Sequence, residues 1–317
     1  MTKYVISGYI GFDNFGDEAI AGVLTGMLKK NGAEKITVIS SNPEKTSELY
    51  GVNSVKMLDF IKPILECDCL ISGGGSLLQD VTSLKSLIYY LAIIMTAKTF
   101  GKKVKIFAQG FTPFRTKIGK FLTGFVLKHC DEISVRDEKS QSLLKEMGVE
   151  SKLVCDPVFG IEVPKTQKNG VGIQLRSFDG LSEEFIETLI QETKKMFPDK
   201  EIKLISLQDS LDLPVLQGRG NVVSGLNVKE VIEEISGLEY LIGMRFHACL
   251  IGAKAGVKVL GLNYDIKVET LAKEIGFPVI NLKPDEIKTG LEVLIHTNPA
   301  EYRIPECKII AFLLQNT

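Results

Sequence analysis

Short runs of β-branched residues alternate with longer stretches of helical spacing through the first half of the chain. Tyr4–Ser7 is one such run, and apolar residues then recur every three to four positions over Gly16–Lys30. The same pattern predicts further strands at 36–39, 68–72, 104–108 and 132–135, and helices at 82–100, 118–129 and 139–147. This order of strands and helices is typical of a parallel sheet with crossover helices.

A polar segment separates this pattern from a second one. Residues 161–170 (IEVPKTQKNG) contain a proline and a glycine and show little periodicity. Beyond them, strands are predicted at 171–175, 202–206, 222–223, 240–242 and 258–260, and helices at 182–196, 228–235, 246–255, 267–275 and 305–314. We therefore expect an α/β protein of two Rossmann-like parallel-sheet domains, 1–162 and 171–317, joined by a linker at 163–170. The carboxyl ends of their strands would face a ligand cleft.

Length, composition and charge narrow the class of protein. The chain has 317 residues, of which 44 % are hydrophobic and 24 % are charged, an ordinary balance for folded domains. Its 38 basic and 39 acidic residues give a formal net charge of −1, so we expect no nucleic-acid partner. The composition does not indicate an oligomeric state.

The chain start and the longest apolar stretch bear on where the protein works. Met1–Lys3 leads directly into the first predicted strand, so we expect no signal peptide and a cytoplasmic protein. The longest apolar stretch, Leu87–Ala97, is 11 residues long, whereas a membrane-spanning helix needs about 20. Peripheral contact with the inner membrane surface stays open.

Cysteine spacing argues against a metal site. The six cysteines stand at 67, 69, 130, 155, 249 and 307, without CxxC spacing, so we predict buried free thiols. No cluster of His, Asp or Glu has the spacing of metal ligands either. We expect no cofactor.

Two glycine-rich segments follow predicted strands in the first half. Residues 8–18 (GYIGFDNFGDE) precede a helix, and backbone amides there suit an anion or a sugar hydroxyl beside Asn14 and Asp17. The alternative is a turn with an acidic helix cap. Residues 72–80 (SGGGSLLQD) place glycines at a strand end, which indicates close approach of a ligand to the backbone. The candidate residues of this segment are Gly73, Gly74, Gly75 and Gln79.

Arginine is rare in this chain, and its positions are therefore informative. Only six of the 38 basic residues are Arg, and Arg136, Arg176 and Arg245 all follow predicted strands. A planar guanidinium at such a place suits phosphate or carboxylate. The alternative for each is a surface ion pair.

His247 lies two residues beyond Arg245, in the segment GMRFHA at a predicted helix start. A phosphate bound there would favour the protonated imidazole and make His247 a candidate general acid. The alternative is a neutral histidine packed at the helix start. His129 and His296 have no comparable neighbours, and we expect them to be structural or solvated.

These segments together resemble the polysaccharide pyruvyl transferase family, in particular its bacterial members that modify cell-wall polymers for S-layer attachment. The resemblance runs in order over residues 4–269, through GYIGFDNFGDEAI, SGGGSLLQD, TSLKSLIYYL, AQGFTP, SVRDEKSQSLLKEMGV, DPVF, IQLRSF, GMRFHACLIGAKAGV and NYDIKV. Two positions depart from it: Lys85 stands where the family commonly has Arg, and Ser177-Phe178 stands where a Pro-Trp pair often follows Arg176.

The resemblance implies ketal pyruvyl transfer from phosphoenolpyruvate, a substrate, to two hydroxyls of a lipid-linked or polymeric sugar. It implies His247 as the acid, with Arg136, Arg245 and Arg176 on the donor's anionic groups. The Gly73–Gly75 loop would approach the donor, and Asn14, Asp17 and Gln79 the acceptor. The implied fold is like that of the B-type glycosyltransferases, with the C-terminal helix packed on the first domain.

Two other functions fit the same pattern. A nucleotide-sugar glycosyltransferase shares this architecture, and the strand–helix alternation does not separate the two. The departures at Lys85 and Ser177-Phe178 also fit a non-catalytic sugar- or phosphate-binding protein.

Overall fold

The computed structural model describes residues 2–81 and 83–306 and divides the chain into two compact units. Unit 1 is Met1–Gly160 and unit 2 is Ile161–Pro305. The segment expected as a linker, 163–170, is bonded into unit 2, because Thr166 and Lys168 both donate side-chain hydrogen bonds to the carbonyl of Ser236. The predicted helix at 305–314 lies almost wholly outside the described residues.

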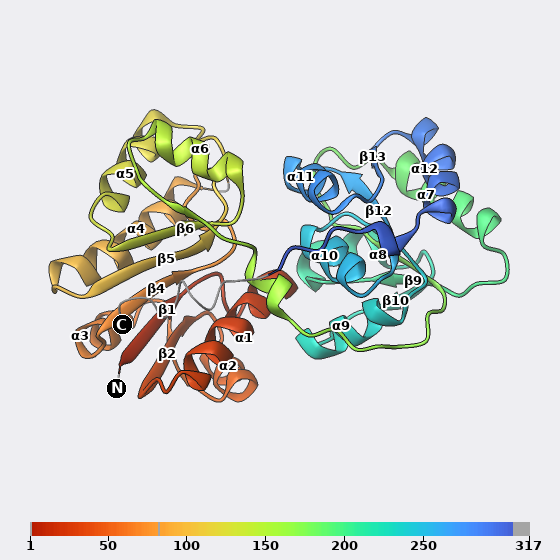
Figure 1. The fold of residues 1–317 in the computed structure, drawn as a ribbon. Coiled ribbons are helices and arrows are strands. Elements are labelled where there is room, and N and C mark those ends of the chain that lie inside the picture. Colours follow the sequence, from red (N-terminus) through yellow and green to blue (C-terminus); the bar gives the residue numbers. More distant parts are fainter. Residues whose placement is uncertain (1, 82, 307–317) are drawn as a thin grey trace. The chain divides into compact units, whose positions relative to one another are not determined.

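Unit 1 is built on a seven-stranded parallel sheet of order β3-β2-β1-β4-β5-β6-β7 (Figure 1). Its strands are β1 (Lys3–Ser7), β2 (Lys35–Ser40), β3 (Asn53–Lys56), β4 (Cys69–Gly73), β5 (Lys103–Gln109), β6 (Glu132–Val135) and β7 (Lys152–Leu153). Its helices are α1 (Phe15–Lys30), α2 (Pro43–Tyr50), α3 (Ile61–Glu66), α4 (Leu84–Thr99), α5 (Lys117–Leu127), α6 (Glu138–Glu146) and the 3₁₀ turn η1 (Pro157–Gly160).

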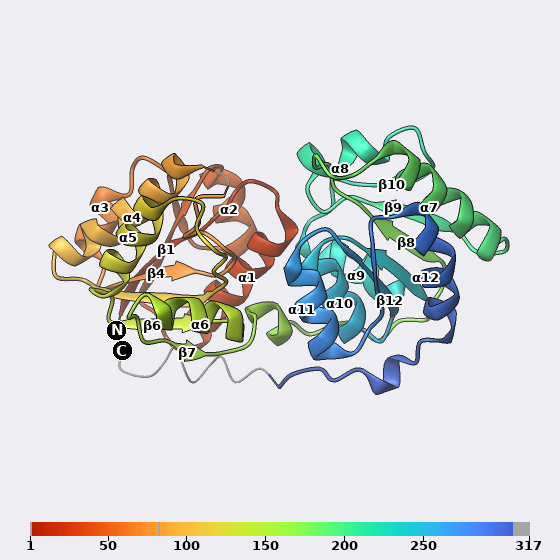
Figure 2. The same ribbon diagram turned by 90° about the horizontal axis from the view of Figure 1, so that it is seen from above.

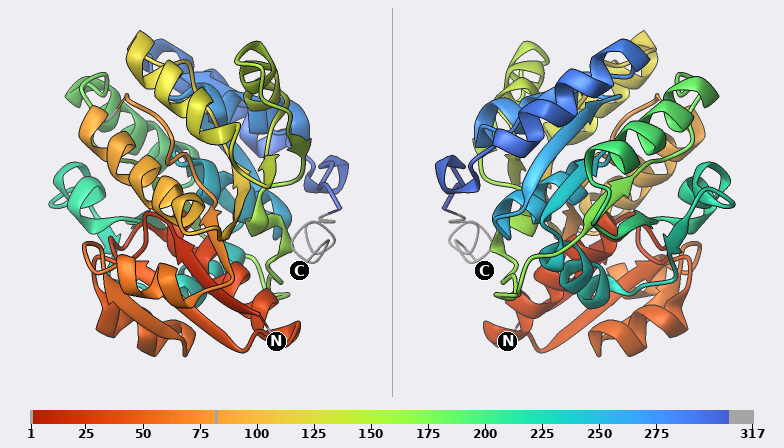
Figure 3. Two further views of the ribbon diagram at one scale, coloured as in Figure 1. Left: turned by 90° about the vertical axis from the view of Figure 1, so that its left-hand side faces the viewer. Right: turned by 90° about the vertical axis from the view of Figure 1, so that its right-hand side faces the viewer.

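Helices cover the sheet of unit 1 on both faces. α1 packs against α2, and α4 packs against both α3 and α5. In Figure 3, left, α4 and α5 lie side by side. Strand β4 is buried along its whole length, as expected for a parallel strand covered on both faces. The apolar stretch Leu87–Ala97 lies in α4 and supplies Leu87, Ile93 and Ile94 to the core, each almost fully buried.

Unit 2 is built on a six-stranded parallel sheet of order β10-β9-β8-β11-β12-β13 (Figure 2). Its strands are β8 (Val171–Gln174), β9 (Ile202–Ile205), β10 (Asn221–Val223), β11 (Tyr240–Gly243), β12 (Lys258–Asn263) and β13 (Val279–Asn281). Its helices are α7 (Glu183–Met196), α8 (Asp209–Leu216), α9 (Val228–Gly237), α10 (Phe246–Lys254), α11 (Ile266–Ile275), α12 (Pro284–His296) and the turn η2 (Pro299–Glu301). α7 packs against α12, and α10 contacts both α9 and α11.

The structure adds elements that the hydrophobic pattern does not predict. β3 (NSVK) and β7 are short and lie at or near the edge of the sheet, where burial imposes little pattern. α8 contains Pro214 and has weak periodicity, and β13 and α12 also lie outside the predicted elements. One prediction is wrong: Cys155 is disulfide-bonded. Cys67, Cys69 and Cys249 are buried free thiols as expected, and Cys130 is a free thiol that is half-buried.

The strand order reverses once in each sheet. In unit 1 the reversal lies between β1 and β4, and in unit 2 it lies between β8 and β11. Loops that leave neighbouring strands in opposite directions open a crevice at the carboxyl ends of those strands. Within the described parts of the chain, no helix is long and apolar enough to span a bilayer.

Candidate functional site

The loop between β1 and α1 is held by its own helix. Asn14 is the N-cap of α1, and its Oδ1 accepts a hydrogen bond from the Gly16 amide at 3.2 Å. Glu18 accepts the Gly11 amide at 2.6 Å and the Tyr50 hydroxyl at 2.5 Å. Burial raises the pKa of the Glu18 carboxyl, which the two hydrogen bonds oppose only in part. Glu18 thus fixes the glycine loop, a role that its charge alone does not reveal.

The three glycines at the end of β4, Gly73–Gly75, have different reasons to lack a side chain. A Cβ at Gly73 would lie 2.7 Å from Leu24, and one at Gly74 would lie 2.2 Å from Ile20, so close packing of α1 already requires these two. Gly75 has φ +68°, and its Cβ would lie 2.6 Å from Oδ1 of Asp17. The structure therefore brings two predicted site residues, Asp17 and Gly75, together at the reversal point of unit 1.

Arg136 follows β6 and reaches the same loop. A Cβ at Gly110 would lie 2.8 Å from Arg136 Nε, and Arg136 Nη2 lies 3.5 Å from the Ser76 hydroxyl. Its Nη1 donates to Asp156 at 2.8 Å, and both side chains are buried. Asp156 thus offsets the charge of Arg136, a pairing that the sequence analysis does not predict.

Gln79 is half-buried, and its neighbour Asp80 has a structural task. The Asp80 carboxylate accepts the amides of Arg115 and Thr116 at 2.7 and 2.8 Å, and also the Thr116 hydroxyl. Asp80 thereby ties the start of α5 to the segment behind the glycine loop.

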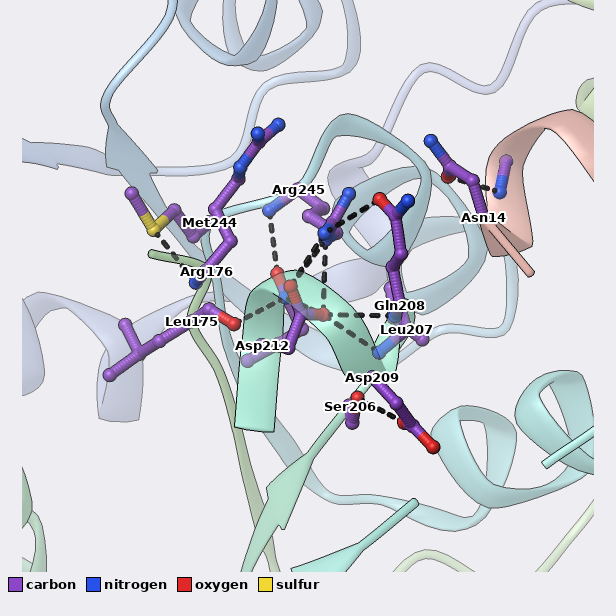
Figure 4. Close-up of polar contacts among 12 residues, drawn as sticks. Asn14, Leu175, Arg176, Ser206, Leu207, Gln208, Asp209, Asp212, Met244 and Arg245 are labelled. Atoms are coloured by element: carbon purple, nitrogen blue, oxygen red, sulfur yellow. Dashed lines mark hydrogen bonds and ion pairs between the residues drawn. The ribbon is translucent and has the colours of Figure 1, made fainter. Parts of the chain in front are cut away.

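In unit 2, Arg245 is buried in a polar network (Figure 4). Its Nη2 lies 2.5 Å from Asp212 Oδ1, and its Nε lies 3.1 and 3.2 Å from the two carboxylate oxygens. Nη2 also donates to Oε1 of Gln208 at 3.3 Å. The guanidinium is therefore fixed in place by a side-on ion pair.

Asp212 is the centre of this network. Its Oδ2 accepts the amides of Leu207 and Gln208 at 2.8 and 3.1 Å and the side chain of Gln174 at 3.3 Å. Gln174 in turn accepts the Arg245 amide at 2.7 Å. Asp212, Gln174 and Gln208 carry no sequence signal, because Arg245, which all three contact, stands between 33 and 71 residues further along the chain.

Arg176 follows β8 and differs from the other two arginines. Its guanidinium lies 5.5 Å from the ring centre of Tyr264, and Figure 4 shows its side chain turned away from Asp212. Within the described residues it makes no ion pair, and its buried Nε has no hydrogen-bond partner. Burial raises the pKa of Tyr264, and the nearby guanidinium opposes that shift. Phe178 also packs against Tyr264, with ring centres 5.8 Å apart.

His247 stands in the first turn of α10, next to Arg245 at the N-cap. Its ring contacts Phe246 at a centroid distance of 5.0 Å. Gln174 and Gly243 are register partners on β8 and β11, so Arg176 and Arg245 leave neighbouring strands at equivalent positions. Unit 2 therefore presents two arginines and a histidine at its reversal point.

A cavity of about 900 Å³ in unit 1 lies away from these loops. It is lined by the first residues of β1, β2 and β3 and by α3, at the amino ends of those strands. It contains none of the predicted site residues, and we assign it no role.

The two units define the class of the molecule, a GT-B-like fold of two parallel α/β sheets. The UDP-GlcNAc 2-epimerase of Methanocaldococcus jannaschii matches with a TM-score of 0.67 and 9 % identity, over 99 % of this chain and 98 % of that chain. The UDP-N-acetylglucosamine 2-epimerase of Rickettsia bellii matches with a TM-score of 0.66 and 10 % identity, over 99 % of this chain and 95 % of that chain. Anabaena Alr3699/HepE, solved with UDP and glucose, matches with a TM-score of 0.62 and 10 % identity, over 99 % of this chain and 95 % of that chain. At such identities the likeness concerns the fold alone.

A sequence comparison then gives the family. The model for the polysaccharide pyruvyl transferases matches residues 14–266, most of the chain. The chain therefore belongs to the polysaccharide pyruvyl transferase family and is a transferase. This family implies a pyruvate donor and a sugar-polymer acceptor. The individual site residues stay predictions.

Proposed function

We propose that the chain moves the enolpyruvyl group of phosphoenolpyruvate to two hydroxyls of a cell-wall or exopolysaccharide sugar and releases phosphate. The observation that carries the proposal is the reversal point of unit 2. There His247 and Arg245 share the start of α10, and Arg176 leaves the adjacent strand. The amides of a helix start add further donors for an anion.

The donor carries a phosphate and a carboxylate, so its site needs cations. Arg176 makes no ion pair among the described residues, and it would supply net positive charge. Arg245 is compensated by Asp212, and Arg136 by Asp156, so these two would contribute oriented hydrogen bonds. In this scheme the Gly73–Gly75 loop approaches the donor through its backbone.

His247 would act as the general acid. It would give a proton to the methylene carbon of the donor, which makes the neighbouring carbon electrophilic. One sugar hydroxyl forms a bond to that carbon, and the bond to phosphate breaks. The second hydroxyl then closes the ketal. Of the two protons that the hydroxyls lose, one balances the proton gained by carbon and the other leaves with phosphate.

The acceptor would bind through Asn14, Asp17 and Gln79. The Asp17 carboxylate lies against Gly75, where it suits a sugar hydroxyl as hydrogen-bond acceptor and base. Asn14 already caps α1, and its amide group would be its remaining donor. A lipid-linked or polymeric amino sugar, as in S-layer anchoring, is the acceptor class that we propose. The scheme uses no metal or other cofactor, so EDTA should leave turnover unchanged.

The experiment is a phosphate-release assay with phosphoenolpyruvate, with and without a lipid-linked N-acetylmannosamine disaccharide. We expect acceptor-dependent release and a product whose added mass equals one pyruvyl ketal. No release, together with no donor binding in calorimetry, would remove phosphoenolpyruvate from the proposal. Tight donor binding without turnover on any acceptor would instead indicate a binding protein.

A nucleotide-sugar glycosyltransferase is the second candidate. The similar fold of HepE, solved with UDP and glucose, favours it. Hydrolysis of a UDP-sugar by this chain, without any use of phosphoenolpyruvate, would decide for this candidate.

A further inference from the structure

Charge is unevenly distributed along the sequence of unit 1. Residues 81–130 contain nine Lys or Arg and no Asp or Glu. The other 267 residues contain 29 basic and 39 acidic residues. In the fold, Lys98 and Lys105 of this stretch pair with Asp131 and Glu132, whereas Arg115, Lys117, Lys120 and Lys128 lie on or beside α5.

The helix α5 is turned with its large apolar residues outward. Ile118, Phe121 and Phe125 are 55 %, 69 % and 50 % exposed, and their spacing places them on one face of the helix. The side toward the protein carries small residues, among them Gly119 and Gly124. Burying one phenylalanine contributes about 1.5–3 kcal/mol, so leaving two exposed forgoes stability that an inward face would provide.

The inward face of α5 is tightly packed, so the helix cannot simply turn over. A Cβ at Gly119 would lie 2.7 Å from the Asp80 carboxylate, and one at Gly124 would lie 3.3 Å from Met147. The outward position of the phenylalanines is therefore built into the fold. The apolar stretch of α4, by contrast, is core.

Cations surround the exposed apolar stripe of α5. Arg115, Lys117 and Lys128 are exposed, and none of them makes an ion pair with another described residue. Lys120 lies 3.9 Å from Glu146 of α6, an exposed and therefore weak pair. Lys85 at the start of α4 is also exposed. We call this surface the basic apolar face: Ile118, Phe121, Phe125, Arg115, Lys117, Lys120 and Lys128.

We propose that the basic apolar face binds the surface of an anionic lipid bilayer. A helix with apolar residues on one face and flanking lysines lies in the interface of such a bilayer, with aromatic rings among the acyl chains and ammonium groups on the headgroups. A second copy of the chain on this face would bring the same exposed cations, Arg115, Lys117 and Lys128, against one another, whereas an anionic bilayer complements them. Asp80, next to Gln79, binds the start of α5, so a bound bilayer would lie near a residue that the proposed function assigns to the acceptor.

The test is co-sedimentation of the full chain with vesicles of 70 % phosphatidylcholine and 30 % phosphatidylglycerol, against vesicles of pure phosphatidylcholine. We expect binding to the anionic vesicles alone, weakened by salt. Phe121→Ser/Phe125→Ser should weaken it at least tenfold. Lys117→Gln/Lys128→Gln should weaken it about thirtyfold. The matched controls Leu58→Ser/Val293→Ser and Lys194→Gln/Lys195→Gln change equally exposed residues elsewhere and should bind as the unchanged chain does.

Three results would overturn the proposal. They are no binding to anionic vesicles at 0.1 M salt, equal binding by the phenylalanine variant, or a dimer that this variant turns into a monomer. The last result would assign the face to a second copy of the chain. Vesicle binding needs no substrate, so it is independent of the proposed reaction. Turnover of a soluble acceptor by the phenylalanine variant should be unchanged.

Discussion

The two units share one sheet plan but present different chemistry where their strand order reverses. In unit 1 the loops after β1 and β4 offer backbone and the carboxylate of Asp17, and Arg136 reaches them from β6. In unit 2, Arg176 and Arg245 leave the two central strands directly, and His247 follows. Backbone and a carboxylate suit hydroxyls, whereas guanidinium groups at a helix start suit anions. We propose from this difference that unit 1 supplies the carboxylate for the acceptor hydroxyls and that unit 2 supplies the net positive charge for the donor.

The arginines sharpen the comparison. Arg136 and Arg245 each have a buried aspartate as partner, one in each unit. Arg176 has the ring of Tyr264 beside it, and no carboxylate within salt-bridge distance among the described residues. A buried pair is close to neutral, so we expect a donor with several negative charges to depend most on Arg176.

The largest effect should come from His247→Ala. Loss of a general acid lowers turnover by about 10²–10⁴-fold, while binding of phosphoenolpyruvate in calorimetry should survive. His296→Ala, at the exposed end of α12 in the same unit, is the matched control and should leave turnover unchanged. Normal turnover of the His247 variant would remove it from the acid role.

Breaking the two buried pairs should destabilise each unit separately. Asp212→Ala leaves Arg245 buried without its partner, and Asp156→Ala does the same to Arg136. Each change should lower the free energy of unfolding by about 3–5 kcal/mol. Hydrogen exchange should show lower amide protection in unit 2 for Asp212→Ala and in unit 1 for Asp156→Ala. Glu183→Ala removes an exposed partner of Arg219 and should cost less than about 1 kcal/mol. If all three variants lost the same free energy of unfolding, the two buried ion pairs would be no more important for stability than the exposed one.

Arg176→Ala should weaken binding of the donor and leave the stability of the fold nearly unchanged. A charged hydrogen bond contributes about 1.5–3 kcal/mol, so the dissociation constant for phosphoenolpyruvate should rise about 10–100-fold. The thermal midpoint should change little, because no ion pair is lost. Lys in place of Arg176 should restore part of the affinity. Unchanged donor binding in calorimetry would move the net positive charge of the site to another residue.

The smallest effect is expected from a glycine substitution in the loop after β4 of unit 1. Gly75→Ala places a side chain at φ +68° and pushes on Asp17, whereas Gly101→Ala has the same φ and nothing within 4 Å. The left-handed conformation should cost both variants about 1–2 kcal/mol. Only Gly75→Ala should also raise the KM for the acceptor, measured with saturating phosphoenolpyruvate. The same KM for both variants would show that Asp17, which a side chain at position 75 would displace, does not position the acceptor.

Much of the fold and part of the candidate site could be predicted from short segments of the sequence. The alternation of strands and helices gives the α/β class, and the placement of Arg136, Arg176 and Arg245 after strands is confirmed. The triglycine is an instructive partial case: Gly73 and Gly74 lack side chains because α1 packs on them. The glycines in the sequence indicate that some group packs closely against the backbone, but the sequence does not show that this group is a helix of the same unit rather than a ligand.

The sequence by itself determined the periodic elements, because the spacing of apolar residues along one segment is a local property. Only the tertiary structure decided which arginine is compensated. Asp212 stands 33 residues before Arg245, and Asp156 stands 20 residues after Arg136. It likewise decided that Phe121 and Phe125 face outward, since small residues of α5 occupy the close contacts with Asp80 and Met147. Charge compensation and the choice of a helix face depend on partners distant in sequence, which the fold alone brings together.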